Sequence, residues 1–198
     1  MSAVAIITAR GGSRRIPRKN IRDFHGKPII AYSIETAKAS GLFDQIIVST
    51  EDDEIRKVAH HYGVSWQDRP QRLAEDGAGT QEVMSHALNM LTDEYKYACC
   101  IYPCAPLMTA SDLRRGLLLI KLPMTMYAVS VGTNPLSDAG QWYWGRSEAF
   151  IHAPDVLFDQ MTRLFPLPPG RVCDINTEED WVRAERLYAD LYLTEGAV

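Results

Sequence analysis

The sequence predicts an α/β protein, a three-layer α/β/α sandwich with a mostly parallel sheet. Short β-rich apolar runs alternate with longer segments in which apolar residues recur every three or four positions. This is the pattern of buried strands connected by crossover helices. The chain has 198 residues, of which 46% are hydrophobic and 23% charged, as in an ordinary globular domain. We therefore expect a single domain over residues 1–198.

The first β-loop-α-β unit carries the clearest signals. The apolar run 4–9 suits a strand buried on both faces, and it leads directly into a Gly-Gly turn at 11–12. Pro28 is typical of the first turn of a helix, and Gly41 stands where a helix C-cap is expected. A second buried strand is predicted at 45–50.

The alternation continues toward the C-terminus. Helical spacing is found around 55–62, 83–90 and 113–120, and β-rich runs lie at 64–66, 97–101 and 126–131. The last helix begins with a capping box that runs from Thr177 to Asp180. Residues 141–145 (QWYWG) are rich in β-formers but stand outside this rhythm, so we expect them to form a small hairpin over the sheet that covers a ligand.

Charge and cysteine content exclude several classes of protein. The 21 basic and 25 acidic residues give a formal net charge of −4, so no global positive field attracts nucleic acid or an anionic membrane. No run of about 18 apolar residues is long enough to span a bilayer, and the N-terminal apolar stretch is too short for a signal peptide. The four cysteines lack the spacing of a disulfide framework. We expect a cytoplasmic protein that binds neither nucleic acid nor membrane.

The strongest chemical signal is a basic loop within this acidic chain. Between residues 10 and 27, the only acid is Asp23, against the cations Arg10, Arg14, Arg15, Arg18, Lys19, Arg22 and Lys27. Gly11 and Gly12 follow a buried strand, so backbone N–H groups can turn toward an anion there. The loop matches neither a Walker A nor a GxGxxG pattern. The residues alone predict a polyphosphate site, with a solvated basic loop as the alternative.

Residues 9–20, ARGGSRRIPRKN, resemble the nucleotide-binding signature of the CMP-sialic acid synthetase family of cytidylyltransferases. The similarity continues through DFHGKPIIAYSIETAKASGLFDQIIVST, DRPQRLAED, CIYPCAPL, DAGQWYWG and RVCDINTEEDW, and it is greatest with the pseudaminic acid branch of the family. The resemblance implies a Rossmann-like sheet of the nucleotide-diphospho-sugar transferase type. It also implies an enzyme that joins CMP from CTP to a nine-carbon ulosonic acid, with release of pyrophosphate and Mg²⁺ as cofactor.

The resemblance assigns CTP binding to one set of residues. These are Ala9, Arg10, Gly11, Gly12, Ser13, Arg14, Lys19, Asn20, Arg69 and Thr80. Arg10, Ser13 and Lys19 would hold the triphosphate, Arg69 would read cytosine, and Thr80 would approach the ribose. A guanidinium suits cytosine because the base presents O2 and N3 as acceptors. The family usually carries lysine at position 14, and the arginine found here keeps the charge.

Asp174 and Asn176 are the expected metal ligands, and Arg10, Lys19 and Asp174 are the expected catalytic residues. The family usually has aspartate at both outer positions of the Asp174-Ile175-Asn176 segment. Asn176 offers a neutral oxygen instead, so we expect a lower affinity for Mg²⁺. From the residues alone, the segment ends a strand, and its two outer side chains point the same way. The alternative is that it only precedes and caps the last helix.

Three further residues are assigned to the sugar pocket by the resemblance: Tyr102, Gln141 and Arg171. Arg171 is the candidate for the sugar carboxylate, and the alternative is that it pairs with a nearby acid. The acidic run 51–54 is tempting as a metal site. Acids in the first turn of a helix are what the helix dipole favours, so we interpret this run as a cap.

The middle of the chain departs from the family pattern. After Val131 the family continues through a longer segment with an arm that forms a homodimer and reaches the neighbouring sugar site. Here only residues 132–137 precede the DAGQ motif, so the arm is shortened or absent. Two alternative functions stay open: the same reaction on N-acetylneuraminic or legionaminic acid, and a non-catalytic CTP-binding relic, which Asn176 and the short middle would favour.

Overall fold

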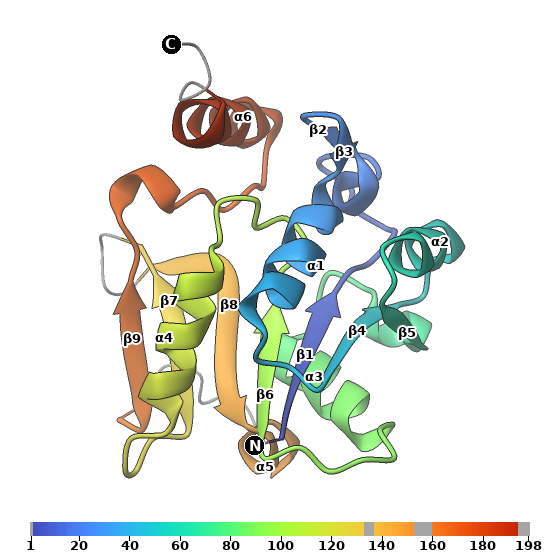
Figure 1. The fold of residues 1–198 in the computed structure, drawn as a ribbon. Helices are drawn as coiled ribbons and strands as arrows, with labels where there is room; N and C mark the ends of the chain where they lie inside the picture. The colour runs from blue at the N-terminus through green and yellow to red at the C-terminus, as the bar shows by residue number, and fades with distance from the viewer. Residues whose placement is uncertain (1, 133–136, 153–159, 194–198) are drawn as a thin grey trace.

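The computed structural model describes residues 2–132, 137–152 and 160–193. These residues form a three-layer α/β/α sandwich (Figure 1), which confirms the predicted fold class. Within these ranges, no helix has the length and apolar character needed to cross a bilayer. All four cysteines are buried free thiols.

A seven-stranded sheet in the order β5-β4-β1-β6-β8-β7-β9 forms the middle layer. The strands are β1 (Ala3–Thr8), β4 (Gln45–Thr50), β5 (Ser65–Asp68), β6 (Tyr97–Ile101), β7 (Tyr127–Val131), β8 (Asp138–Arg146) and β9 (Thr162–Pro166). Neighbouring strands are parallel except at β8, which is antiparallel to both β6 and β7. At the centre, Ile6 of β1 lies between Ile47 and Cys100. The central strands are apolar on both faces because helices cover both.

Helices α1 (Ile29–Ser40), α2 (Asp53–His61) and α4 (Ala110–Ile120) cover one face, and α3 (Thr80–Asn89) and α5 (Ser147–His152) cover the other. The alternation of side chains along β1 serves both layers. Ala3, Ala5 and Ile7 belong to the core beneath α1, α2 and α4, whereas Val4 and Ile6 belong to the core beneath α3.

A cap of smaller elements sits at one end of the sheet (Figure 1). It contains the 3-10 turn η1 (Lys19–Ile21), the hairpin β2 (Asp23–Phe24) and β3 (Lys27–Pro28), and helix α6 (Glu178–Tyr192); the turns η2 (Gln71–Leu73) and η3 (Pro169–Arg171) lie in the remaining loops. Phe24 joins the hairpin to α6 by edge contacts with Trp181 and Tyr188, each with ring centroids 5.6 Å apart. This third core cluster fixes the N-terminal loop against the C-terminal helix.

Several predicted boundaries are confirmed. Strand β4 has the expected limits, and α1 begins directly after Pro28. Gly41 caps α1 with a φ of 64°, the left-handed conformation that glycine adopts without strain. The capping box of α6 is also present, with the Asp180 N–H donating to Thr177 Oγ1 at 3.2 Å.

The hairpin predicted at 141–145 is wrong. These residues form the middle of β8, between β6 and β7, and Trp142 and Trp144 are fully buried. Gly116 of α4 makes room for them, because a Cβ at that position would lie 2.6 Å from Trp144 and 2.7 Å from Trp142. An antiparallel strand can follow its neighbour through a short link, without the helix on which the predicted rhythm depended.

The strand expected to end at 174–176 is also wrong. The segment between η3 and α6 is a loop. Asp174 and Asn176 nevertheless lie together, because Asn176 Nδ2 donates to Asp174 Oδ2 at 2.5 Å. A hydrogen bond, rather than strand periodicity, brings the two side chains to one place.

Residues 133–136 of the short middle lie outside the described residues. On either side of them, the Gly132 N–H donates to the Ser137 carbonyl at 3.1 Å, and Val131 pairs with Asp138. The strand ends that border this stretch are therefore adjacent in the sheet.

Candidate functional site

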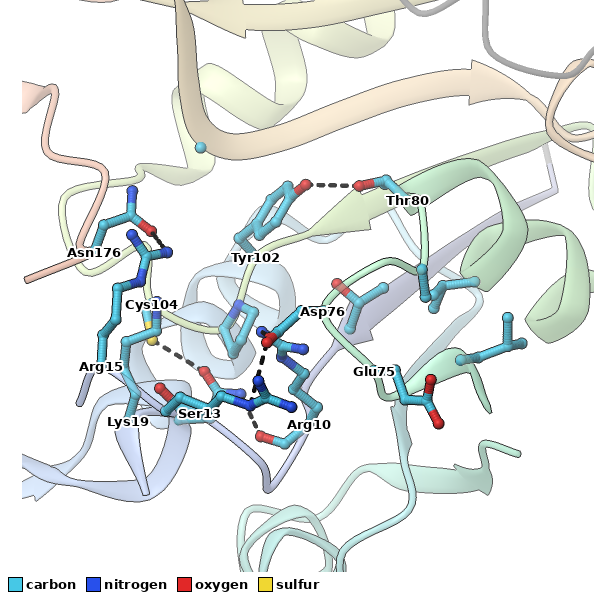
Figure 2. A pocket seen from close by; sticks show the side chains of 18 of the residues that line it. Arg10, Ser13, Arg15, Lys19, Glu75, Asp76, Thr80, Tyr102, Cys104 and Asn176 are labelled. Carbon is cyan, nitrogen blue, oxygen red and sulfur yellow. Dashed lines mark hydrogen bonds and ion pairs between the residues drawn. The ribbon is translucent and has the colours of Figure 1, made fainter. Parts of the chain in front are cut away.

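A polar pocket of about 550 Å³ opens at the carboxyl ends of the central strands. Ligands of open α/β sheets bind at this edge, where the loops that leave the strands diverge. Figure 2 shows the pocket from close by. Of the predicted site residues, the pocket is lined by Arg10, Ser13, Arg14, Lys19, Asn20, Arg69, Thr80, Tyr102, Asp174 and Asn176. One cavity thus gathers residues that are up to 166 positions apart in the sequence.

Four cations of the basic loop line this pocket and are held there by protein oxygens: Arg10, Arg14, Arg15 and Lys19. Arg10 Nη2 pairs with Asp76 at 2.6 Å, and Arg14 Nε lies 3.3 Å from the same carboxylate. Lys19 Nζ donates to the Ile175 carbonyl at 2.6 Å. The guanidinium of Arg10 holds the pKa of Asp76 below its usual range, so the acid stays ionised. A polyanion entering the pocket meets positioned cations.

Acidic residues that directly follow β4 bond the basic loop and fix its position. Arg18 adopts a left-handed φ of 56° and donates to Asp52 from two nitrogens, at 2.5 and 2.9 Å. This pair and two backbone N–H groups of α2 lower the pKa of Asp52 to about 2. Gly11 packs so closely that a Cβ would lie 2.2 Å from Asp52. Asp52 accepts from Glu54 and Ile55 N–H groups, which confirms that the acidic run caps α2.

The remaining residues of the loop contribute backbone. Ala9, Gly11 and Gly12 were expected at the nucleotide, and they form the connection from β1 into the loop, although their atoms are not among those lining the pocket. The Ala9 N–H donates to the Ser49 carbonyl at 3.1 Å, and the Ser13 N–H to the Gly11 carbonyl at 3.0 Å. These bonds fix the path of the chain between strand and pocket.

Asn20 is committed to the loop itself. Its Nδ2 donates to the Arg10 carbonyl at 2.8 Å, and its Oδ1 accepts from Cys104 Sγ at 3.1 Å. Burial raises the pKa of the Cys104 thiol to about 12, so the thiol keeps the proton that it donates. Both polar ends of Asn20 therefore position Arg10 and η1.

The opposite wall combines Arg69, Thr80 and Tyr102. Arg69 is only 6% exposed, and its guanidinium donates to Ser49 from Nη2, at 2.7 Å to the carbonyl, and from Nε, at 3.3 Å to Oγ. Burial lowers the pKa of Arg69 to about 10, which leaves it charged at neutral pH. The hydroxyls of Thr80 and Tyr102 lie 2.7 Å apart (Figure 2). This wall offers fixed donors beside the cationic loop.

Oxygen donors gather at the end of the pocket near α6. Arg15 Nη2 donates to Asn176 Oδ1 at 2.8 Å (Figure 2). Gly140 has a φ of 61°, and a Cβ there would lie 2.9 Å from Asp174 Oδ1, so the backbone leaves space for the carboxylate. The described residues contain no cluster of three or more acidic, His or Cys metal ligands. One carboxylate and one amide oxygen fit Mg²⁺, which keeps several waters and takes substrate phosphate oxygens.

Two of the three predicted sugar residues lie outside the pocket lining. Arg171 forms an ion pair with the buried Asp112 and donates to Thr109 Oγ1 at 3.4 Å, which is the pairing that the sequence left open as an alternative. Gln141 is 2% exposed, and its Nε2 donates to the Arg171 carbonyl at 2.5 Å. Of the three, Tyr102 lines the cavity.

Ten residues that line the pocket are not among the predicted site residues, and three of these, Arg15, Asp76 and Cys104, bond predicted site residues. Arg15 belongs to the basic loop, and the other two lie in the DRPQRLAED and CIYPCAPL segments. Each of the three residues therefore lies in a segment that the sequence already marked as part of the site. Their partners, Asn176, Arg10 and Asn20, are far away in the sequence, so spacing could not reveal these contacts.

Comparison with known proteins gives matches along most of the chain. The family model described as cytidylyltransferase matches residues 4–134. A pseudaminic acid cytidylyltransferase of Campylobacter jejuni is 34% identical over 225 residues, covering 95% of this chain and 97% of the relative. An N-acylneuraminate cytidylyltransferase of Escherichia coli is 36% identical over 110 residues, 56% of this chain and 26% of the relative.

Solved structures share the fold. A CMP:2-keto-3-deoxy-manno-octonic acid synthetase complexed with CTP has a TM-score of 0.76 at 16% identity, covering 96% of this chain and 100% of that one. A Mycobacterium tuberculosis protein in complex with manganese has a TM-score of 0.68 at 14% identity, covering 94% of this chain and 99% of that one. At these identities the likeness concerns the fold.

Proposed function

The chain belongs to the cytidylyltransferase family, and from this premise we propose that it joins CMP from CTP to pseudaminic acid, with release of pyrophosphate. The observation that carries the proposal is the pocket itself, which has positioned cations on its loop side and oxygen donors near α6. The 34% identity to a pseudaminic acid cytidylyltransferase over 95% of the chain supports this choice of sugar.

The basic loop would hold the triphosphate. Arg10, Arg14 and Lys19 line the cavity, and their present partners are an exposed carboxylate and two backbone carbonyls that phosphate oxygens can replace. Arg69 would donate to the cytosine acceptors and Thr80 would approach the ribose. Fixed cations that need no rearrangement stabilise the charge that develops on a transferring phosphoryl group.

Mg²⁺ would be held by Asp174 and Asn176 together with phosphate oxygens. When bound, the ion would neutralise charge on the phosphates and polarise the phosphorus. The amide of Asn176 already bridges Arg15 and Asp174, so this residue also orients the carboxylate. A protein with this fold has been solved in complex with manganese, which supports a divalent cation as cofactor.

The proposed reaction is a substitution at the α-phosphorus of CTP. A bond forms between this phosphorus and the anomeric oxygen of the sugar, and the bond to the bridging oxygen of pyrophosphate breaks. Pyrophosphate leaves with the electron pair, and the hydroxyl proton passes to solvent. The residues of the pocket contribute orientation and charge neutralisation, and no covalent enzyme intermediate is needed.

Pyrophosphate release tests the proposal. Wild-type protein is incubated with CTP and Mg²⁺ and with pseudaminic, N-acetylneuraminic or legionaminic acid, and ATP, GTP and UTP replace CTP as controls. We expect turnover with CTP and pseudaminic acid. Turnover with another acid alone would reassign the sugar, and CTP binding without turnover would favour a non-catalytic relic.

Replacing Lys19 tests the role of the loop. We expect Lys19→Ala to lower turnover with CTP by about 100-fold, the scale of removing one donor to a developing oxyanion. Lys57→Ala is the matched control, because Lys57 lies exposed on α2, outside the pocket. Unchanged turnover in Lys19→Ala would refute the phosphate assignment.

The proposed function also bears on the short segment 132–137 and on the cellular location of the protein. The alignment to the Campylobacter jejuni relative runs over 225 residues, whereas this chain has 198, so the relative has positions without a counterpart here. We place this difference at 132–137, where adjacent strand ends accept a short link as readily as a long arm. A homodimer that depends on the arm would then be lost, and we expect the enzyme to act in the cytoplasm.

A further inference from the structure

The end of β4 holds both halves of the proposed nucleotide pocket. The Ala9 N–H donates to the Ser49 carbonyl at 3.1 Å, and the Gly11 N–H donates to Glu51 Oε1 at 2.7 Å. These two bonds fix the start of the basic loop, which is proposed to hold the triphosphate. Residues 49–51 also bond the segment that carries Arg69, the residue proposed to contact the base. The Arg69 N–H donates to the Thr50 carbonyl at 3.1 Å.

The side chain of Arg69 returns to the same segment. Its guanidinium bonds Ser49 twice, and at 6% exposure it is largely removed from water. A buried guanidinium needs a nearby negative charge to offset its lost hydration. Burial lowers the pKa of Arg69, and among its neighbours Glu51 is the main group that raises this pKa again. Glu51 and Arg69 also line a common second cavity of about 460 Å³.

Glu51 is suited to serve both the Gly11 N–H and the Arg69 guanidinium. One carboxylate oxygen accepts from Gly11, and the other, Oε2, is buried without a hydrogen-bond partner among the described residues. A buried negative charge beside a loop that takes a triphosphate opposes the binding of that anion. Attraction of phosphate therefore does not explain a carboxylate at this position, whereas compensation of Arg69 does.

We infer that Glu51 is a positioning residue that couples the basic loop to Arg69, and that through Arg69 it favours cytosine over uracil. The inference rests on the proposed function, in which Arg69 donates to O2 and N3 of the base. Uracil carries a hydrogen on N3, so a guanidinium held in one orientation discriminates against it. A guanidinium that has lost its anchor can turn and discriminates less.

Glu51→Gln separates the two tasks. The glutamine keeps an acceptor for the Gly11 N–H but removes the negative charge that opposes the effect of burial on Arg69. Binding of CTP, UTP and tripolyphosphate is measured by calorimetry, without sugar. We expect the CTP-to-UTP affinity ratio to fall about tenfold, the scale of one charge-assisted hydrogen bond. Tripolyphosphate, which contacts only the loop, should bind equally well or up to about threefold more tightly, because a like charge is gone.

Two controls make the result specific. Asp53→Asn removes a charge two positions away, at a side chain that is 80% exposed and pairs with Arg56, and should change neither quantity. Arg69→Lys is combined with Glu51→Gln in a double-mutant cycle. If Glu51 acts through Arg69, the glutamine has no further effect on the CTP-to-UTP ratio once Arg69 is replaced.

Each outcome has one meaning. Opposite responses of CTP and tripolyphosphate, lost in the Arg69→Lys background, support the inference. A parallel loss of affinity for all three ligands, or an unchanged CTP-to-UTP ratio, overturns it and leaves Glu51 as a support of the loop. Failure of the wild-type protein to bind CTP would overturn the proposed function and this inference together, whereas binding without an effect of Glu51→Gln overturns the inference alone.

Discussion

At the scale of single residues, the pocket is a set of cations paired with weak protein partners. Asp76 bonds Arg10 and lies near Arg14, two of the cations that we propose for the triphosphate. Lys19 donates to a backbone carbonyl, and Arg15 donates to the amide oxygen of a side chain. Such contacts hold the side chains in place before a ligand arrives, and most of them are exposed enough to be exchanged at low cost.

Replacement of Asp76 should strengthen CTP binding. Asp76→Asn removes the anion that competes for Arg10, so we expect the dissociation constant for CTP to fall about three- to tenfold at neutral pH. Glu75→Gln is the matched control, because Glu75 lines the same pocket but forms no ion pair with any residue that the structure describes. Weaker binding of CTP by Asp76→Asn in calorimetry would show that Asp76 instead orients Arg10 for the ligand.

Restoring an acid at position 176 should improve the metal site. Asn176→Asp adds a charged oxygen donor beside Asp174, and hard cations bind carboxylates more strongly than amides. We expect the Mg²⁺ concentration for half-maximal turnover to fall several-fold, and Asn89→Asp, at an exposed position of α3 outside the pocket, to leave it unchanged. An increase in that concentration would mean that the bridge from Asn176 to Arg15 and Asp174 matters more than the added charge.

At the scale of elements, loops on strand ends carry the chemistry, and helix termini fix those loops. Asp180 illustrates this, since its carboxylate accepts from the N–H groups of Asn176 and Thr177 as well as from the Thr177 hydroxyl. The capping box of α6 thus anchors the loop that contains Asp174. At the other side, the Asp52 carboxylate caps α2 and also accepts from Arg18 of the basic loop.

Loss of the α6 cap should destabilise the protein. Thr177→Ala removes the acceptor for the Asp180 N–H, so we expect the free energy of unfolding to fall by about 1 kcal/mol in urea denaturation. Thr177→Ser keeps the hydroxyl and should restore most of the stability. If alanine and serine behave alike, the hydroxyl cap contributes little, and tertiary contacts such as those of Phe24 with Trp181 and Tyr188 hold α6.

At the scale of the whole molecule, stability should depend on pH through the pair of Arg18 and Asp52. The pKa of Asp52 is about 2 in the folded state, below its value near 4 in an unfolded chain. The folded state therefore binds the proton less well, and the pair stabilises the protein fully above about pH 4. The contribution is lost as the pH falls from about 4 to about 2.

Asp52→Asn isolates this contribution, because asparagine is also a good N-cap. We expect a loss of about 2 kcal/mol in the free energy of unfolding at pH 7. The difference from the wild type should shrink toward pH 3, as measured by urea denaturation at several pH values. Asp53→Asn should cost less than about 0.5 kcal/mol throughout. A difference for Asp52→Asn that does not vary with pH would exclude the ion pair as its cause.

Much of the fold follows from local patterns in the sequence. Strand β4, the start of α1 at Pro28, its cap at Gly41 and the capping box of α6 all depend on residues within a few positions of one another. Likewise, the charge density of residues 10–27 predicts an anion site, because like charges repel unless an anion compensates them. The sequence by itself therefore determined the fold class, the basic loop and the family resemblance.

Only the tertiary structure decided what depends on distant partners. It placed residues 141–145 in the interior of the sheet, because Gly116 of a separate helix leaves room for two tryptophans. It paired Arg171 with Asp112, and it brought Glu51 to the Gly11 N–H. Such contacts join residues 40 to 59 positions apart, and they form when strands from different parts of the chain align. No local pattern of charge or hydrophobicity encodes that alignment.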